Sequence, residues 1–347
     1  MFETFEFETL TAPQAAVFFG LGLGVLFGIL AQITRFCLRR ALVGDDRRAA
    51  AGVWLTALAV AVVGTQTAVS VGWISFADHR FLGAELPVLA IVLGGLLFGA
   101  GMVLTRGCVS RLTVLSGAGN LRALSVLIVF AFVAHATLKG VLAPIRTGLG
   151  SFTVPLESAA LPGAPMIWAG LLAIGALFVA IRSGNRPGLL GLAALLGALV
   201  PLGWVGTGFV LYDDFDPIVM ESLSFTAPFS ETLFYTIAST SISPGFGVGL
   251  IGGTLAGALA AALLRGQFVW QSFTSPRETG RYLAGATMMG LGGVLAGGCT
   301  VGAGLSGIPT LSVAALLALA AMAGGALITH RLLKGGAHLN AHSVPAE

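Results

Sequence analysis

Apolar residues dominate this chain in long blocks, and short segments between the blocks carry most of the charges. A run of about 20 apolar residues is long enough to cross the hydrocarbon core of a bilayer as a helix. The connection 211–243 is semi-polar, whereas the others are short. We therefore expect an all-α polytopic membrane protein with about nine transmembrane helices, at residues 14–34, 51–75, 86–105, 120–142, 162–182, 187–210, 244–264, 280–297 and 310–332.

The composition agrees with this class. Of the 347 residues, 56% are hydrophobic and only 10% are charged, whereas a soluble domain carries about a quarter charged residues. The sequence shows no basic patch interleaved with aromatic residues, so no nucleic-acid partner is expected, and it contains no P-loop motif. We also expect no cofactor and no metal, and we interpret the acidic cluster at 212–217 as a solvated loop rather than a calcium site.

The basic residues indicate an orientation in the membrane. Of the 18 Lys and Arg residues, all but Arg80, Lys139 and Arg146 fall on one side of the predicted helices, and most acidic residues fall on the other. Cytoplasmic loops carry an excess of Lys and Arg. The pattern therefore predicts that the N-terminus lies outside and the C-terminus lies in the cytoplasm.

The three cysteines, Cys37, Cys108 and Cys299, occupy the same register of a repeated unit. GVLFGILAQITRFC (24–37) aligns with GLLFGAGMVLTRGC (95–108), and residues 94–117 align with 285–307, each ending in LSG. One unit is a glycine-rich apolar helix, a short segment with a cysteine, and a second apolar helix. The fourth slot, at 222–243, has no cysteine but is rich in Ser and Thr.

The repeat predicts two inverted halves related by a pseudo-two-fold axis in the membrane. The first half covers 14–142 and the second 187–333, with a connector at 143–186 that holds the fifth helix and tails at 1–12 and 334–347. Irregular backbone cannot face lipid, and transporters built this way place it near the midplane. We expect four short re-entrant segments, one in each unit.

The register of the thiols indicates a shared function. A neutral thiol is a weak hydrogen-bond donor and a weak acceptor, which suits a soft sulfur atom, and passage requires weak binding at several sites. An ordinary thiol is mostly protonated near neutral pH. We therefore predict a substrate relay along Cys37, Cys108 and Cys299.

Other residues are candidates for supporting roles. Arg35 and Arg106 would either attract an anion at the cytoplasmic mouth or anchor the chain to lipid phosphate. His135 is an ionisable group within a predicted span and thus a functional candidate, although a packed histidine explains it equally well, and Glu231 presents the same choice. The glycines and serines beside the cysteines complete the set, namely Gly107, Gly298, Ser116 and Ser306.

These motifs resemble the YeeE/YedE family of bacterial sulfur-transport membrane proteins, the thiosulfate permeases. The resemblance is carried by FGILAQITRFCLRRAL, FGAGMVLTRGCVSRL, SFTAP and MMGLGGVLAGGCTVGAGLSG. It implies a pseudo-symmetric protein of the bacterial cell inner membrane that imports thiosulfate or a closely related sulfur anion, with the three cysteines carrying it through S–H···S hydrogen bonds. It also implies a cytosolic TusA-like sulfur carrier as partner.

Two other functions are compatible with the sequence. A membrane sulfurtransferase would hold a persulfide on an activated cysteine. A general anion channel would use the glycine-rich segments, with cysteines that are only structural. The expected protein is a transporter rather than an enzyme.

Overall fold

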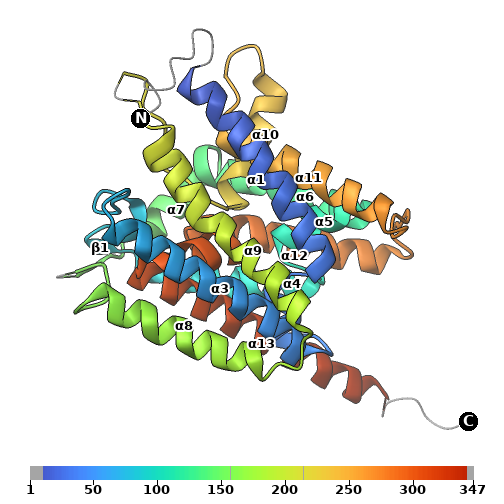
Figure 1. Ribbon diagram of the computed structural model, residues 1–347. Helices are drawn as coiled ribbons and strands as arrows, with labels where there is room; N and C mark the ends of the chain where they lie inside the picture. The colour runs from blue at the N-terminus through green and yellow to red at the C-terminus, as the bar shows by residue number, and fades with distance from the viewer. Residues whose placement is uncertain (1–10, 157, 214, 342–347) are drawn as a thin grey trace, which may run out of the picture.

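The computed structural model describes residues 11–156, 158–213 and 215–341, with side chains through residue 334. Most of the acidic N-terminal tail, and the acidic residues Glu157 and Asp214, lie outside the described residues. The chain is mostly helical and forms an all-α polytopic membrane protein (Figure 1). Within the described residues, eight helical stretches are long and apolar enough to cross a membrane, at Ala12–Val43, Arg47–Ser70, Val88–Gly117, Leu121–Lys139, Pro187–Val210, Phe246–Leu264, Pro276–Thr310 and Val313–Lys334.

Several of these stretches contain more than one helix. The stretches that carry cysteines are interrupted just before each cysteine, and the last helix continues past the expected end of the ninth span into the predicted tail. The main helices are α1 (Ala12–Thr34), α2 (Leu38–Val43), α3 (Arg47–Ser70), α4 (Val88–Leu104), α5 (Val109–Gly117), α6 (Leu121–Lys139), α9 (Pro187–Val205), α11 (Phe246–Leu264), α12 (Pro276–Leu295) and α13 (Val313–Ala341), with the short segments η3 (Gly206–Val210), η4 (Thr300–Gly307) and η5 (Ile308–Thr310).

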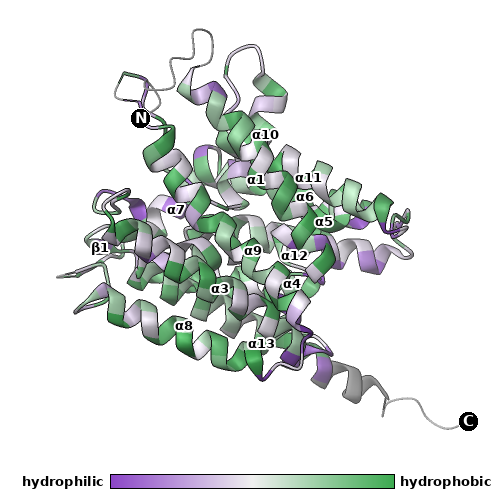
Figure 2. Cartoon of the chain, in the orientation of Figure 1, coloured by the Kyte–Doolittle hydropathy of each residue, from purple (hydrophilic) through white to green (hydrophobic). Residues whose placement is uncertain are grey.

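The expected fifth span corresponds to α8 (Pro165–Ile181), an apolar helix of 17 residues. It is shorter than the eight stretches above and packs on α3 along the lower edge of Figure 1. Several of its large apolar side chains are exposed, among them Ile167, Ile174 and Ile181. Figure 2 shows the same apolar character along the outer helices, with hydrophilic residues concentrated near helix ends. Such a surface is typical of a protein that faces lipid.

Glycine stripes allow the helices to approach closely. Gly20, Gly24 and Gly28 of α1 face α11, and Gly249, Gly253 and Gly257 of α11 face α1. A Cβ added at any of these positions would collide with a backbone carbonyl of the other helix. Small residues at four-residue spacing are the usual means of close helix packing in membranes. Here they bring α1 and α11 together around the segment that precedes Cys37.

The loops contain elements that the hydrophobic pattern did not predict. The semi-polar region 211–243 contains α10 (Thr226–Ala238). Before it, an extended segment enters the core with Leu223 and Phe225 fully buried. A turn of helix, η2 (Arg80–Leu82), precedes α4, and α7 (Ala143–Gly150) follows α6. Finally, β1 (Glu85–Leu86) pairs antiparallel with β2 (Val154–Pro155), Glu85 opposite Pro155 and Leu86 opposite Val154.

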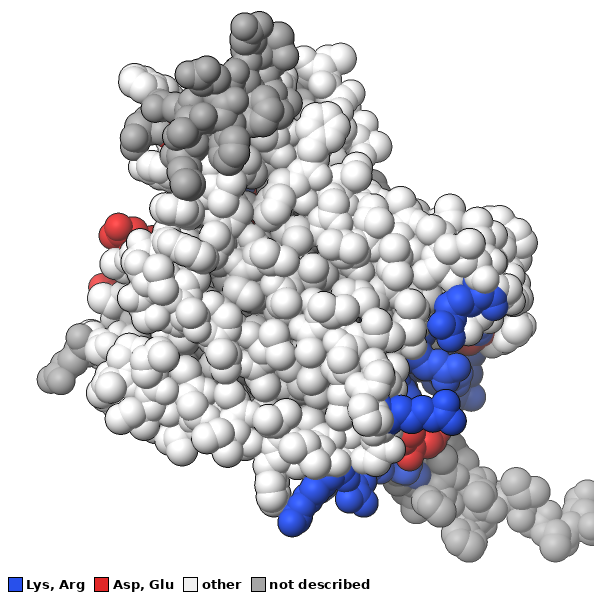
Figure 3. Space-filling model, viewed as in Figure 1, with Lys and Arg blue, Asp and Glu red and all other residues white. Residues whose placement is uncertain are grey.

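Charged side chains are distributed unevenly over the molecule. In Figure 3 the Lys and Arg side chains gather at the right and lower right, and acidic atoms are visible on the left. We call the first side the basic end; it includes the connection between α1 and α3, with Arg35, Arg40, Arg47 and Arg48. The loop 71–87 and the segment 211–225 lie at the other ends of the neighbouring helices, which we call the opposite end.

Candidate substrate site

The three cysteines share one local backbone conformation. Two residues before each cysteine the chain adopts a left-handed conformation, at Arg35 (φ 53°), Arg106 (φ 60°) and Gly297 (φ 75°). A left-handed residue is a common way to end a helix, and it ends α1, α4 and α12 here. Arginine rarely adopts it, at a cost of about 1–3 kcal/mol for each such residue. The repeated sequence thus corresponds to a repeated break in three helices, which is strained at the two arginines and relaxed at Gly297.

Each cysteine then begins the next helical segment. Cys37 is the N-cap residue of α2, Cys108 of α5 and Cys299 of η4. The side chains of these caps meet inside the protein: the Sγ atoms of Cys37 and Cys108 are 4.0 Å apart. This distance is within hydrogen-bonding range for two sulfur atoms and far too long for a disulfide, and all three cysteines are free and buried.

Cys299 lies beside this pair. Its Sγ accepts a hydrogen bond from the backbone N–H of Gly302 at 3.4 Å, and it is close enough to Cys108 for an electrostatic interaction. The hydroxyl of the next residue, Thr300, is also within reach of the Cys108 thiol, and Ser110 Oγ lies 3.4 Å from Cys108 Sγ. The structure therefore brings the three predicted cysteines together into one buried cluster, which we call the thiol cluster.

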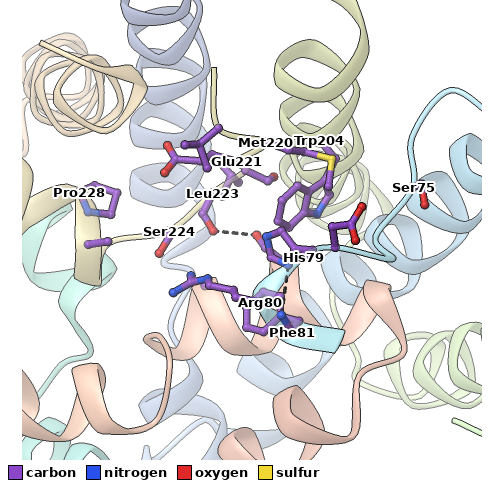
Figure 4. A pocket seen from close by; sticks show the side chains of 16 residues that line it. Ser75, His79, Arg80, Phe81, Trp204, Met220, Glu221, Leu223, Ser224 and Pro228 are labelled. Atoms are coloured by element: carbon purple, nitrogen blue, oxygen red, sulfur yellow. Dashed lines mark hydrogen bonds between the residues drawn. The ribbon is translucent and has the colours of Figure 1, made fainter. Parts of the chain in front are cut away.

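A cavity of about 430 Å³ opens at the opposite end (Figure 4), and its lining includes Gly302 and Ser306 of η4. It is lined by the loop 71–87, by Trp204 of α9, by residues 219–228 and by η4. A smaller pocket of about 30 Å³ shares Arg80 and Ser224 with this cavity and reaches Gly297 and Gly298. This route from the opposite end thus reaches Gly298, the neighbour of Cys299 in the sequence, and Cys299 itself is fully buried.

Ionisable side chains in the cavity have shifted pKa values. Burial, reinforced by the nearby Glu231 carboxylate, raises the pKa of Glu221 to about 7, and Arg80 opposes this shift. Burial and the Arg80 charge lower the pKa of His79 to about 4. At neutral pH His79 is therefore uncharged, and Arg80 is the cation of the cavity wall.

The structure places the supporting candidates at different distances from this route. Gly298 lines the smaller pocket, and Ser306 lines the cavity while its hydroxyl donates to the Leu223 carbonyl at 2.7 Å. Gly107 is buried beside Cys108, and its carbonyl accepts from Thr105 Oγ1 at 3.0 Å. Ser116 lies near the far end of α5, about 12 Å along the helix from Cys108.

The charged candidates lie around the edges of the site. Arg35 and Arg106 are exposed at the basic end. His135 shares a 2.9 Å hydrogen bond with Ser230 and stacks on Phe234 with ring centroids 5.1 Å apart, which agrees with the interpretation of a packed histidine. Glu231 is exposed on α10 and affects the cavity only through its charge on Glu221 and Arg80.

Four residues along this route were not among the candidates predicted from the sequence: Arg80, Glu221, Ser224 and Thr226. One signal was available for Arg80, since it is one of three basic residues on a side otherwise rich in acids. The SFTAP motif, which contains Thr226, was another. In the described part of the chain, no group of three His, Cys, Asp or Glu residues is arranged to hold a metal ion.

Apolar helices enclose the thiol cluster, and a cavity with ionisable side chains in its wall opens on one side of the molecule. These features define a polytopic membrane protein with a candidate internal site. A family model described as "Sulphur transport" matches residues 27–328, and the chain belongs to this family. This confirms the resemblance to the YeeE/YedE family.

Two relatives carry a substrate in their names. The chain is 29% identical over 339 residues to the thiosulfate transporter TsuA of Spirochaeta thermophila, covering 86% of this chain and 93% of that protein. It is 24% identical over 315 residues to the thiosulfate transporter TsuA of Escherichia coli, covering 82% of this chain and 86% of that protein.

Proposed function

We propose that this protein transports thiosulfate, or a closely related sulfur anion, across the cytoplasmic membrane into the cell. The family and the two relatives named as thiosulfate transporters support this substrate and a transporter rather than an enzyme. The observation that carries the proposal is the thiol cluster: Cys37 and Cys108 are in contact at 4.0 Å, and Cys299 lies beside them where the cavity ends.

The proposed mechanism is a non-covalent relay. The terminal sulfur of thiosulfate accepts an S–H hydrogen bond from Cys299, then from Cys108, then from Cys37, and it leaves toward the basic end. No bond to sulfur forms or breaks, so no oxidant or reductant is needed. Each thiol must stay protonated, because a thiolate would repel the anion. Weak S–H contacts at successive sites favour release as well as binding.

We also propose that two inverted halves build this path. In this proposal, the helices α1, α3, α4 and α6 of the first half correspond, in that order, to α9, α11, α12 and α13 of the second half. The pseudo-two-fold axis then relates the contact between α1 and α11 to the contact between α9 and α3. It also relates the contact between α4 and α13 to the contact between α12 and α6. All four pairs pack directly in the structure. The re-entrant segments of this arrangement are α2, α5, η4 and the segment at 222–238, each of which follows a break in the helical chain.

The direction follows from the proposed orientation. With the basic end in the cytoplasm, the cavity opens outside and Cys299 is the first thiol that the anion reaches. This arrangement places the N-terminus outside and the C-terminus inside, in the inner membrane. A TusA-like carrier would then accept sulfur at the basic end, as the family resemblance implies.

The test is uptake of labelled thiosulfate by proteoliposomes that contain the full-length protein. We expect Cys299→Ala and Cys108→Ala to reduce uptake to the level of empty vesicles, because each removes the S–H donor of one step. Cys-to-Ala leaves a small apolar side chain in a buried position, so the elution profile in detergent should stay that of the parent. Parental uptake by both variants would eliminate the relay.

A mass measurement on the same purified protein distinguishes the non-covalent relay from a sulfurtransferase. After incubation with thiosulfate, intact-mass measurement should show unmodified protein if the relay is non-covalent. A stable sulfur adduct on Cys108 would favour the enzyme. Equal uptake of sulfate and thiosulfate, unaffected by the cysteine variants, would instead favour a general anion channel.

A further inference from the structure

The Arg80 side chain projects into the cavity without a counter-ion. Figure 4 shows it extending from η2 toward Ser224, with Glu221 on the same side of the cavity. Among the described residues, no carboxylate lies within 4.0 Å of its guanidinium, which lies over the Phe81 ring at 5.1 Å from the ring centroid. Arg80 lines the cavity, the smaller pocket and a third pocket between η2 and α12. A guanidinium offers five N–H donors in a fixed plane, which suits an oxyanion.

Two hydroxyl groups beside Arg80 also lack partners. Ser224 Oγ and Thr226 Oγ1 are buried, and neither has a hydrogen-bond partner among the described residues. Thr226 is only 4% exposed. Both residues line the smaller pocket together with Arg80 and Gly298. A buried hydroxyl without a partner is destabilising, so two of them beside an unpaired cation indicate a place for a ligand with several acceptor oxygens.

Glycines leave the room that these hydroxyls need. A Cβ on Gly302 would lie 2.7 Å from Ser224 Oγ, and a Cβ on Gly293 would lie 3.2 Å from Thr226 Oγ1. Gly302 also donates its N–H to Cys299 Sγ. The hydroxyls therefore sit next to the backbone that holds the first thiol. Ser224 and Thr226 belong to the segment that corresponds to the cysteine segments of the other three units but has no cysteine.

We propose that Arg80, Ser224 and Thr226 form an oxyanion site that holds the oxygens of a sulfur oxyanion while its terminal sulfur faces Cys299. This inference rests on the proposed function and adds to it the residues that select the substrate. The three donors recognise the oxygens, and the thiol recognises the soft sulfur. Sulfate satisfies the first requirement only, so it binds at this site and is not handed on to Cys299.

Binding measurements on the purified full-length protein test the site separately from transport. Titration calorimetry with thiosulfate and with sulfate gives the affinity for each anion. We expect Arg80→Gln to weaken both anions by about tenfold or more, since a hydrogen bond to a charged group is worth about 1.5–3 kcal/mol. Arg80→Lys should recover part of the loss. Thr226→Val, which removes only the hydroxyl, should weaken both anions less than Arg80→Gln does.

Two further variants distinguish the effect of the oxyanion site on anion affinity from the effect of the Cys299 thiol and from the effect of positive charge in general. Cys299→Ala should weaken thiosulfate and leave sulfate unchanged. Lys139→Gln removes a basic residue at the same end that lines neither the cavity nor the smaller pocket, and it should change neither anion. Parental sulfate affinity in Arg80→Gln would overturn the proposal even if thiosulfate uptake is normal. If that variant does not fold, unchanged affinities in both Arg80→Lys and Thr226→Val would overturn it.

Failure of the proposed function gives a different result. If the parent protein binds sulfate through Arg80 but does not take up thiosulfate, the oxyanion site is supported and the proposed transport of thiosulfate is contradicted. If the parent protein takes up thiosulfate, and the Arg80 and Thr226 variants bind both anions as the parent does, transport is supported and the oxyanion site is contradicted.

Discussion

At the scale of single residues, the site separates two kinds of recognition. The thiols meet in the protein interior, where Cys37 and Cys108 face each other and Cys299 is fully buried. Arg80 lines the cavity, and Arg111 is close enough to Cys37 and Cys108 for an electrostatic interaction. Basic residues at both places attract an anion, whereas weak thiol contacts favour its release. This arrangement suits capture followed by passage.

The charge of Glu221 should control anion entry. Its pKa of about 7 means that the side chain is neutral in mild acid and a carboxylate in mild base. The other charged or titratable groups around it are Arg80, His79 and Asp78 in the cavity wall, Glu231 on α10, and Lys139 beside Glu231. His79, with its pKa of about 4, does not titrate in this range.

We therefore expect the KM for thiosulfate to rise several-fold as the external pH increases from about 6 to about 8, because the new carboxylate repels the dianion and offsets Arg80. Glu221→Gln should keep a low KM across this range. Asp78→Asn, a change in the same cavity, should keep the parental dependence on pH. Uptake rates in proteoliposomes at fixed internal pH provide the measurement, and a Glu221→Gln profile that still rises with pH would contradict the role of Glu221.

The sequence predicted some of these residues and not others, for a physical reason. The cysteines share a register in a repeat, so one-dimensional comparison could identify them. Arg80 and the hydroxyls of Ser224 and Thr226 belong to segments more than 140 residues apart, and only the folded chain brings them to one pocket. Each residue taken alone has an ordinary explanation as a loop residue.

At the scale of elements, hydrophobic length was a reliable guide and polarity was not. The predicted spans and the observed helices begin and end within a few residues of one another, apart from the longer C-terminal helix. The hydrophobic pattern did not predict α10 within the semi-polar region. This helix packs against α6 and α11, and such tertiary contacts cannot be recognised from local polarity. The pairing of β1 with β2 was equally hidden, since two residues per strand give no periodic signal.

The contact between α1 and α11 gives a prediction about stability. A Cβ on Gly253 would collide with the Leu21 carbonyl of α1, whereas Gly252, its neighbour on the same helix, faces open space. Gly253→Ala should lower stability by about 1–3 kcal/mol through overpacking, despite the better helix propensity of alanine. Gly252→Ala should leave stability unchanged or slightly higher. Thermal unfolding of both variants in detergent measures this, and equal melting temperatures would refute the close contact.

At the scale of the whole molecule, the proposed orientation connects the asymmetry of charge with the direction of transport. On the proposed relay, the cavity and the thiol cluster lie on one route, so the side on which the cavity opens determines which thiol the anion meets first. If the basic end faces the cytoplasm, Arg80 faces the external solution and Cys299 precedes Cys108. The reverse orientation would make the same three thiols an export path.

Labelling from outside the cell distinguishes these two orientations. Ser241 lies between α10 and α11 at the end that holds the cavity, and Ser272 lies between α11 and α12 at the basic end; both residues are exposed. The three native thiols are buried and can remain in place, with the parent protein as the background control. An impermeant maleimide added to intact cells should label Ser241→Cys and not Ser272→Cys, and membrane disruption should make Ser272→Cys reactive. Labelling of Ser272→Cys alone in intact cells would reverse the orientation and, with it, the proposed direction of transport.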